Sequence, residues 1–349
     1  MSAPRLHALL PPLAAAAGAL VPLAVALVLS GLVLALAGVD PVAYYRTVIE
    51  RGLLSPSGLQ SSLTRMAPLL LIAASLILAF RAGIWNLGGD GQFLLGATAA
   101  AAVAPPLAAA VPLPVALAAA LVAGAAAGAV WSLVPALLRA CHGINEIITT
   151  LMMSFLGASL ANVLVKLVFL DPATTVPQTR TLAVAERLPR LGSTTVTSGL
   201  LIGLVLLVAV HFIMTRTATG FRLRVVGASP RAARHAGLAV PRLTAGVFAA
   251  SAALAGLAGA VEVVGIAGNV RADWNPAYGL VVVPLVFLAR LNGLAAIGFV
   301  ALYSVLAIGG ESAARRLGVP NSITLVVLAV VLITLAVTEA IGARRRRGS

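Results

Sequence analysis

A glycine-rich segment at residues 83–96, GIWNLGGDGQFLLG, carries polar side chains between apolar stretches. Asn86, Asp90 and Gln92 can hydrogen-bond a polar solute, and the ring of Trp85 can stack against it. Each glycine inside a helix costs about 1 kcal/mol relative to alanine, so a continuous helix is disfavoured. Polar groups at membrane depth are tolerated where they face protein or a wet cavity. We interpret the segment as a broken stretch that lines the path of a polar solute; a cytoplasmic turn between two membrane spans is the alternative.

A second polar group stands at residues 143–154, GINEIITTLMMS. Asn145 and Glu146 are typical of a helix start, where a carboxylate favours the helix dipole. Thr149 and Thr150 follow one turn later, and Glu146 and Thr150 share one helix face at i, i+4 spacing. Glu146 therefore has two interpretations that stay open: a capping role, or a role in a solute path or a subunit contact.

The side chains needed for catalysis or metal binding are scarce. The chain has one cysteine, Cys141, and four scattered histidines, none with a second ligand at metal-binding spacing. The only lysine, Lys166, is followed by Leu167, whereas the Walker A motif of ATPases requires Lys-Ser or Lys-Thr. We expect no catalytic residue, no metal and no cofactor, and no ATP hydrolysis by this chain itself.

Composition sets the class of protein. Of 349 residues, 60% are hydrophobic and 10% are charged, which is far from the balance of a soluble domain. The formal net charge is +14, but the arginines are dispersed in short segments between apolar runs, so nucleic-acid binding is not expected. We predict an all-α, polytopic protein of the bacterial inner membrane, in contact with the lipid bilayer.

Apolar runs long enough to cross a membrane number about ten. Two are irregular: 91–106 ends at a Pro-Pro pair, and 279–310 is interrupted at 290–293, which predicts a hairpin of two short spans. Glu262 and Glu339 stand near predicted helix ends and are expected to reach the membrane interface, with a functional role as the alternative. The remaining predicted spans are 16–38, 62–80, 112–138, 146–170, 198–214, 243–266 and 321–341.

Arginine counts predict the orientation. The first apolar run is too long for a cleaved signal peptide, so we expect an uncleaved first helix. With the N-terminus inside, fourteen arginines fall on the cytoplasmic side and nine on the outer side. Basic residues favour the cytoplasmic side, so both termini are expected there.

The longest cytoplasmic loop is expected at 215–242, and it is basic. Ser229 is a plausible helix cap with Pro230 in the first helical position. Such a segment suits either a partner protein or an anionic membrane surface, and composition leaves both open. Two small-residue motifs, Gly124-x-x-x-Gly128 and Gly256-x-x-Gly259, are expected to let helices approach closely.

Two similar short segments suggest an internal repeat. Trp85-Asn86 precedes Asp90-Gly91, and Trp274-Asn275 precedes Tyr278-Gly279. In the expected topology the two lie on opposite sides of the membrane, as an inverted repeat requires. We therefore expect one transmembrane domain over 1–349 with repeat halves at about 62–170 and 243–341.

Four segments together carry a family resemblance. Residues 85–92 are similar to a motif F-N-I-G-x-E-G-Q, and residues 145–154 to N-E/V-I-x-T-x-M-x-N. Residues 220–238 are similar to a loop with G-x-x-x-R-A-V-G-x-N-P-x-A-A-x-x-A-G-I, and residues 288–294 to a late L-G-x-x-N-P-x-G hairpin without its proline. In this order they resemble the permease subunits of ABC importers of the branched-chain amino acid/simple-sugar family, and within it the nucleoside and simple-sugar branch linked to basic membrane proteins.

The resemblance implies an importer with divided labour. An external solute-binding protein would deliver a nucleoside or simple sugar, and this chain with a second, related or identical, permease chain would form the path. An ATPase pair would bind ATP and dock on the 215–242 loop. The sequence departs from the family motifs at Trp85, Asp90 and Ser229. The first two of these fall in the implied path and leave the solute open. The implied path residues are Trp85, Asn86, Asp90, Gln92, Asn145, Glu146, Thr149 and Thr150, and the implied coupling residues are Gly220, Arg222, Arg224, Gly227, Ala228, Pro230, Ala233 and Gly237.

Two other classes of protein fit the sequence less well. An ion-coupled secondary transporter of a small polar solute would normally place a carboxylate or histidine chain deep inside its spans. Here most acidic residues stand near predicted span ends. An integral-membrane enzyme would need a cluster of reactive side chains, which this sequence does not show.

Overall fold

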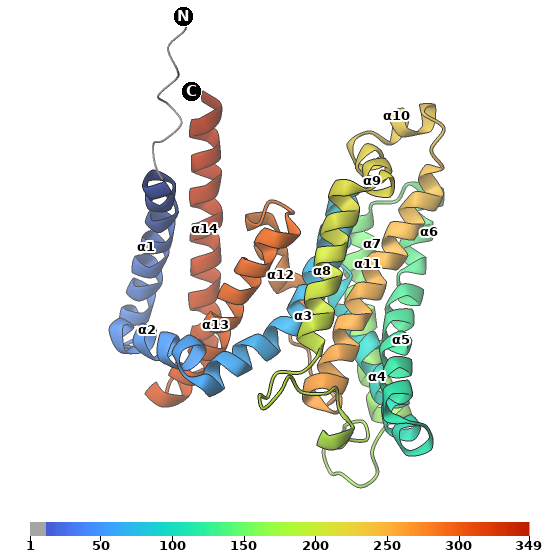
Figure 1. The fold of residues 1–349 in the computed structure, drawn as a ribbon, viewed down its shortest axis with the longest axis horizontal. Helices are drawn as coiled ribbons and strands as arrows, with labels where there is room; N and C mark the ends of the chain where they lie inside the picture. The colour runs from blue at the N-terminus through green and yellow to red at the C-terminus, as the bar shows by residue number, and fades with distance from the viewer. Residues whose placement is uncertain (1–11, 349) are drawn as a thin grey trace, which may run out of the picture. The chain divides into compact units, whose positions relative to one another are not determined.

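The computed structural model describes residues 12–348, and their side chains from 24 to 338. Within these residues the secondary structure is helical, with only isolated β-bridges such as that between Leu170 and Thr179 (Figure 1). The chain forms two compact units. The first holds the described residues up to Leu59 and from Val305 onward, and the second holds Gln60–Ser304.

The helices have the following bounds. They are α1 (Pro12–Leu36), α2 (Pro41–Ile49), α3 (Pro56–Arg81), α4 (Gly89–Ala110), α5 (Leu113–Trp131), α6 (Leu133–His142), α7 (Glu146–Val163), α8 (Gly199–Arg216), α9 (Ala218–Ala228), α10 (Pro230–His235), α11 (Val240–Glu262), α12 (Tyr278–Leu288), α13 (Gly293–Leu317) and α14 (Ser322–Gly348). Short π-helical turns follow three of them, at Glu50–Leu54, Leu164–Val168 and Val263–Ala267, and a 3-10 turn stands at Val184–Glu186.

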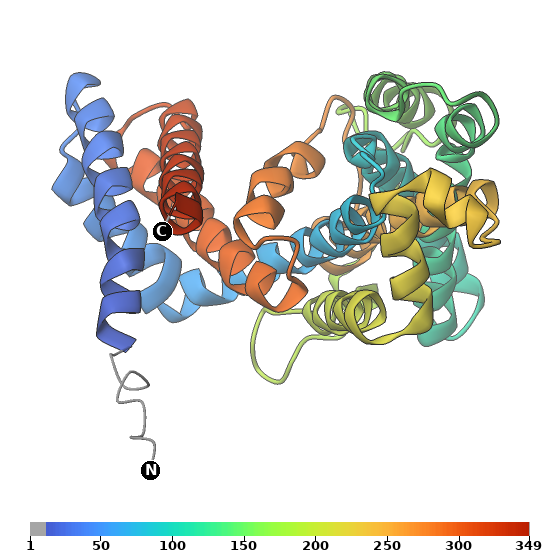
Figure 2. The same ribbon diagram turned by 90° about the horizontal axis from the view of Figure 1, so that it is seen from above.

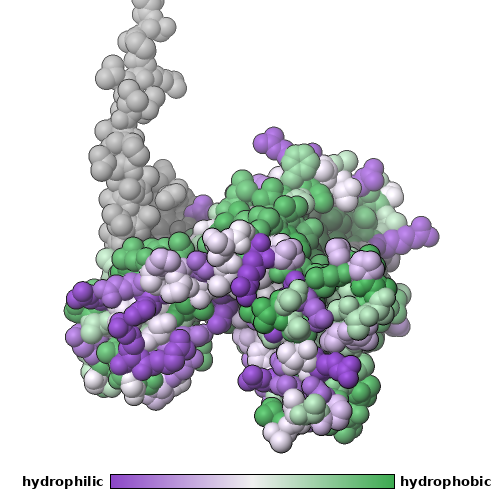
Figure 3. Space-filling model, turned by 60° about the horizontal axis from the view of Figure 1, so that its bottom comes forward, coloured by the Kyte–Doolittle hydropathy of each residue, from purple (hydrophilic) through white to green (hydrophobic). Residues whose placement is uncertain are grey.

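The helices confirm a polytopic membrane protein. Seven stretches of the described residues are long and apolar enough to cross a membrane, and three shorter apolar helices accompany them. In the space-filling view, hydrophilic residues gather at the ends that face the reader and hydrophobic residues cover much of the flanks (Figure 3). The predicted hairpin is present as α12 and α13, joined by a turn in which Arg290 and Leu291 have φ near +52° and +57°.

Two details differ from expectation. Helix α4 does not end at its Pro-Pro pair but continues through Pro105 and Pro106 to Ala110. The prolines stand in the last turns, so only the carbonyls of Ala101 and Ala102 lose a helical partner. The second arm of the hairpin, α13, has 25 residues and is not a short span.

Helices α4, α5 and α11 pack closely against one another in the second unit. Figure 2 shows the ribbon from above. They approach closely through glycine: a Cβ at Gly128 would meet the backbone of Gly256 at 3.0 Å, and one at Gly124 would meet the Gly96 carbonyl at 2.9 Å. The predicted close approach at both small-residue motifs is confirmed, because any side chain there would force the helices apart.

The first unit has its own small core. Helices α1, α2 and α14 enclose Leu34, Tyr44 and Val331, all almost fully buried. The Tyr44 hydroxyl donates to Thr324 Oγ1 at 3.0 Å, and the Tyr45 hydroxyl lies 2.7 Å from Ser30 Oγ. Burial raises the pKa of Tyr44 above its ordinary value. The single domain and the inverted repeat stay predictions.

Candidate functional site

The glycine-rich segment is a break between two helices. Helix α3 ends at Arg81 and α4 begins at Gly89, and the residues between them are not helical. Gly83 has a φ of +70°, a conformation that favours glycine. Trp85 is 41% exposed, whereas the neighbouring Asn86 is 1% exposed. The non-helical stretch is shorter than expected, because residues 89–96 belong to α4. A connection between two spans fits both the path-lining stretch and the turn, so both interpretations stay open.

Asn86 is the centre of a buried polar network. Its Nδ2 donates to Ser251 Oγ at 3.0 Å and to Gln92 Oε1 at 3.2 Å. Its Oδ1 accepts from Gly88 N and from Gln92 Nε2, both at 3.1 Å. Ser75 Oγ extends the network by donating to the Ser251 carbonyl at 2.7 Å. The network ties α3, α4 and α11 together, and its groups are satisfied internally, as buried polar groups require.

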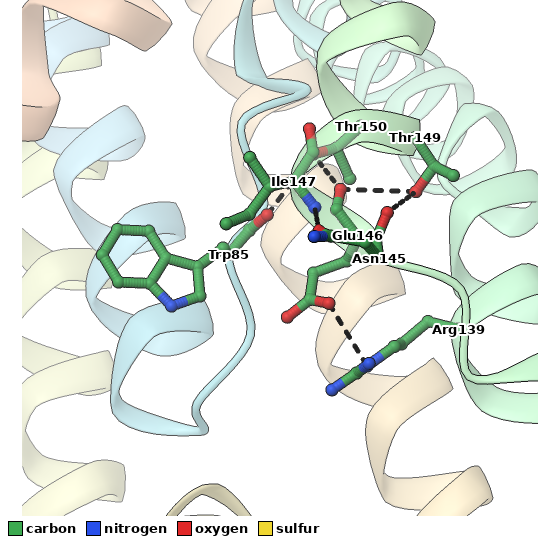
Figure 4. A network of polar contacts seen from close by, with 7 residues as sticks. All are labelled: Trp85, Arg139, Asn145, Glu146, Ile147, Thr149 and Thr150. Carbon is green, nitrogen blue, oxygen red and sulfur yellow. Dashed lines mark hydrogen bonds and ion pairs between the residues drawn. The ribbon is translucent and has the colours of Figure 1, made fainter.

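The start of α7 holds the same break from the other side (Figure 4). Thr150 Oγ1 accepts from Leu87 N at 3.1 Å and donates to the Glu146 carbonyl at 2.6 Å, and it lies 3.3 Å from the Trp85 carbonyl. Asn145 caps the helix by accepting from Ile147 N at 2.9 Å. Glu146 is buried and pairs with Arg139 Nε at 3.3 Å. The place of Glu146 in the first turn of α7 agrees with a capping role, and its ion pair joins α6 to α7. A role in a solute path or a subunit contact stays a prediction.

Asp90 connects the two similar segments, 85–91 and 274–279, that suggested the internal repeat. Its Oδ1 accepts from Gly279 N at 2.6 Å, at the first turn of α12. The ring of Phe93 lies 5.8 Å from Trp274 and 5.5 Å from Tyr278, centre to centre. A carboxylate near two helix N-termini is electrostatically favourable, so Asp90 holds α4 and α12 together.

The exposed part of the site is aromatic. The Trp85 ring lies 5.7 Å from that of Phe287 and 5.1 Å from that of Phe80. Phe287 is itself exposed. An exposed aromatic pair offers a flat apolar face, which suits the ring of a base or the apolar side of a sugar.

The structure thus brings all eight predicted path residues to one region, in two roles. Trp85 and Asn145 are exposed and Thr149 is half-buried, so these can meet a solute in this conformation. The other five are buried and hold the break in place: Asn86, Asp90, Gln92, Glu146 and Thr150. Their assignment to a solute path stays a prediction.

Other residues of the site carry no signal in the sequence. Ser75 and Ser251 stand inside apolar runs, and Gly279 looks like one glycine among 33. Their roles depend on contacts between helices distant in the chain. Arg139 is easier to find, because a basic residue at the end of α6 stands seven positions before the first acid of α7.

Glu262 stands near the end of its span, as expected, because the span ends at Ala267, one residue beyond the predicted end. Its side chain is 8% exposed, and its Oε2 has no hydrogen-bond partner among the described residues. Its place at the membrane interface stays a prediction. Arg65 of α3 is near enough for a Coulombic interaction. The side chain of Glu339 lies outside the described residues.

The predicted coupling loop folds as two short helices, α9 and α10 (Figure 1). Ser229 Oγ accepts from Ala232 N at 3.2 Å, which confirms the predicted cap. Gly220 and Ala233 are buried and Gly227 is half-buried. The exposed members of the predicted coupling set are Arg222, Arg224, Ala228, Pro230 and Gly237.

Gly227 connects the coupling loop to the candidate path. A Cβ built on Gly227 would lie 2.6 Å from the Ala82 carbonyl carbon and 2.7 Å from Gly83 N. The backbone of α9 therefore rests directly on the chain that leads from α3 to Trp85. No flexible side chain lies between the two segments at this contact.

The chain matches a known family over most of its length. The family model described as the branched-chain amino acid transport system permease component covers residues 58–336. The chain belongs to this permease family. No solved structure matches it.

Curated relatives agree. This permease is 32% identical to the "Glucose ABC transporter permease protein TsgB13" of Haloferax volcanii, over 90% of this chain and 85% of that protein. It is 30% identical to the "Guanosine ABC transporter permease protein NupP" of Bacillus subtilis, over 80% and 81%. It is 28% identical to the "Nucleoside ABC transporter permease protein NupB" of Lactococcus lactis, over 86% and 85%. The predicted role of an ABC importer permease is thereby confirmed.

Proposed function

We propose that this permease forms the membrane path for a nucleoside or a simple sugar that an external solute-binding protein delivers. It acts in the bacterial inner membrane with both termini in the cytoplasm, beside a second permease chain, related or identical. ATP is bound and hydrolysed by a partner ATPase. The observation that carries the proposal is the similarity to permeases named for glucose, guanosine and nucleosides over at least 80% of this chain.

The site supports a polar solute with a flat face. Trp85 and Phe287 present exposed rings, and Asn145 and Thr149 at the start of α7 present polar groups. A nucleoside offers a base to stack and hydroxyls to hydrogen-bond, and a sugar offers an apolar ring face and hydroxyls. Relatives named for glucose and for nucleosides have nearly equal identity to this chain, so the comparison does not choose between them.

The loop geometry supports coupling to an ATPase. α9 and α10 carry exposed arginines beyond the ends of the spans, and Gly227 rests on the backbone at Gly83. ATP binding in the partner moves α9, and α9 moves the break that carries Trp85. This assigns the residues of 215–242 to transmission rather than to contact with solute.

Uptake of labelled guanosine, uridine, ribose and glucose by cells with and without the chain tests the proposal. We expect uptake of one nucleoside or sugar class that depends on the chain and is competed by unlabelled members of that class. Trp85→Ala should lower that uptake severalfold while the protein level in the membrane stays the same. Chain-independent uptake of all four solutes would contradict the proposal.

A further inference from the structure

An apolar groove of about 570 Å³ runs along α8 and α11, which lie side by side in Figure 1. The buried side chains of Val210 and Val247 belong to its floor, and the small side chains of Ala250 and Ala253 leave room in it. Helix α11 packs closely against α4 and α5 but contacts α8 at few places, so space remains between α8 and α11. Both helices belong to stretches that are long and apolar enough to cross a membrane, so the groove lies at membrane depth.

One end of the groove carries a positive charge. Arg242, in the first turn of α11, is exposed and is the only charged residue among the described residues that line the groove. It forms no ion pair within the part of the chain that the structure describes. Thr219, which is also exposed, adds a hydroxyl to the lining. Since Arg242 is the third residue of its span, it stands at the level of the lipid headgroups.

The dimensions of the groove favour an acyl chain over a protein helix. The residues of α11 that line it extend from Arg242 to Leu257, which is about 22 Å along the helix axis at about 1.5 Å per residue. A volume of about 570 Å³ spread over that length leaves a channel roughly 5–6 Å across. A helix with its side chains is about 10–12 Å wide and does not fit, whereas an extended hydrocarbon chain is far narrower.

We propose that this groove binds an anionic phospholipid. One acyl chain lies against Val210, Val247 and Ala250, where its methylenes leave water and contact apolar side chains. The phosphate of the headgroup forms charge-assisted hydrogen bonds with the guanidinium of Arg242. A free phosphate ion would leave the apolar groove unfilled, so the charged and apolar parts together select a lipid. The inference does not depend on the solute or on the ATPase of the proposed function.

Photolabelling with two lipids locates the site and tests the headgroup. The full-length permease, with any subunits that co-purify, is placed in phosphatidylcholine vesicles that contain a small share of a lipid with a diazirine on one acyl chain. The headgroup of this probe is either phosphatidylglycerol or phosphatidylcholine, and labelled residues are identified by mass spectrometry. We expect the anionic probe to label the groove residues of α8 and α11 at least fivefold more than the zwitterionic probe. The exposed residues Val122 and Val130 of α5 do not line the groove and should be labelled equally by both probes.

Two neutralised arginines separate a specific site from a general surface charge. Arg242→Gln should lower labelling of the groove by the anionic probe to the level of the zwitterionic probe, because it removes the charge that selects the headgroup. Arg231→Gln makes the same change at an exposed arginine of α10 that does not line the groove, and it should keep the preference. Equal losses in the two variants, or equal labelling of the groove by the two probes in the unchanged protein, would overturn the proposal. Competition by inorganic phosphate, beyond that of chloride at the same ionic strength, would overturn a lipid as the occupant.

A variant that fills the groove gives an independent readout. Ala250→Phe places a ring where the acyl chain lies and should lower labelling of the groove by the anionic probe at least fivefold. Val205→Phe is the matched control, because Val205 is an exposed residue of α8 that does not line the groove. It should leave the labelling unchanged. Unchanged labelling in the Ala250 variant, or separation of that variant from a co-purifying permease chain without loss of labelling, would refute the lipid site; the second result would indicate a protein interface.

Discussion

Two neighbouring threonines at the start of α7 differ in their burial and in their hydrogen bonds. Thr150 is fully buried and accepts from Leu87 N, whereas Thr149 is half-buried and lies 3.3 Å from its two local carbonyl partners. The break between α3 and α4 therefore depends on one hydroxyl and not on the other.

Thr150→Val should lower the free energy of unfolding by about 1–3 kcal/mol, because it leaves the Leu87 N–H without its acceptor. Thr149→Val is the matched control and should cost less than 1 kcal/mol, about the value of one exposed hydrogen bond. Thermal unfolding of the purified variants in detergent measures both. Equal melting temperatures for the two variants would contradict the role of the Thr150 contacts drawn in Figure 4.

The role of Asp90 in joining α4 to α12 can be tested with two variants. One removes the hydrogen-bond acceptor, and the other removes only the negative charge. Asp90→Ala removes the acceptor of Gly279 N and should destabilise the protein by about 1–3 kcal/mol. Asp90→Asn keeps a side-chain oxygen and should recover part of that loss, since only the charge is removed. The same melting assay ranks the three proteins. An alanine variant as stable as the unchanged protein would show that the α4–α12 contact does not need Asp90.

At the scale of elements, local features were predictable and long-range contacts were not. The caps at Asn145 and Ser229 depend on residues two or three positions away, so the sequence pattern predicts them. The partners Asn86 and Ser251 stand 165 positions apart, and Asp90 and Gly279 stand 189 apart. A single sequence gives no signal that residues so far apart in the chain are in contact. Glu262 shows the same limit, because its burial against other helices could not be predicted from its position near the end of a span.

The contact between α9 and the end of α3 gives a prediction for coupling. Gly227→Ala should uncouple transport, because the added methyl would meet the backbone of Ala82 and Gly83 below 3 Å. ATP-dependent uptake should fall at least severalfold, with normal insertion in the membrane. Gly246→Ala is the control, since a Cβ there meets nothing within 4 Å. Full uptake by the Gly227 variant would exclude this contact as the point of transmission.

At the scale of the whole molecule, composition predicted the class of protein and left the solute open. An apolar share of 60% requires a membrane, and the described residues provide seven long apolar helices and three shorter ones. The choice of solute depends on a few side chains around Trp85 and on the second permease chain. Neither composition nor hydrophobic periodicity contains information about these. The order of the motifs indicated the family, because four short motifs in the same order are more specific to one family than a single motif is.

The central claim is that another subunit supplies the energy for transport through this permease. Uptake of the identified solute is measured in cells that express the full system, after ATP depletion and, separately, after collapse of the ion gradients with ATP preserved. We predict that uptake stops when ATP is depleted and continues when the gradients collapse. Uptake that survives ATP depletion but stops with the gradients would contradict the account and would indicate an ion-coupled transporter.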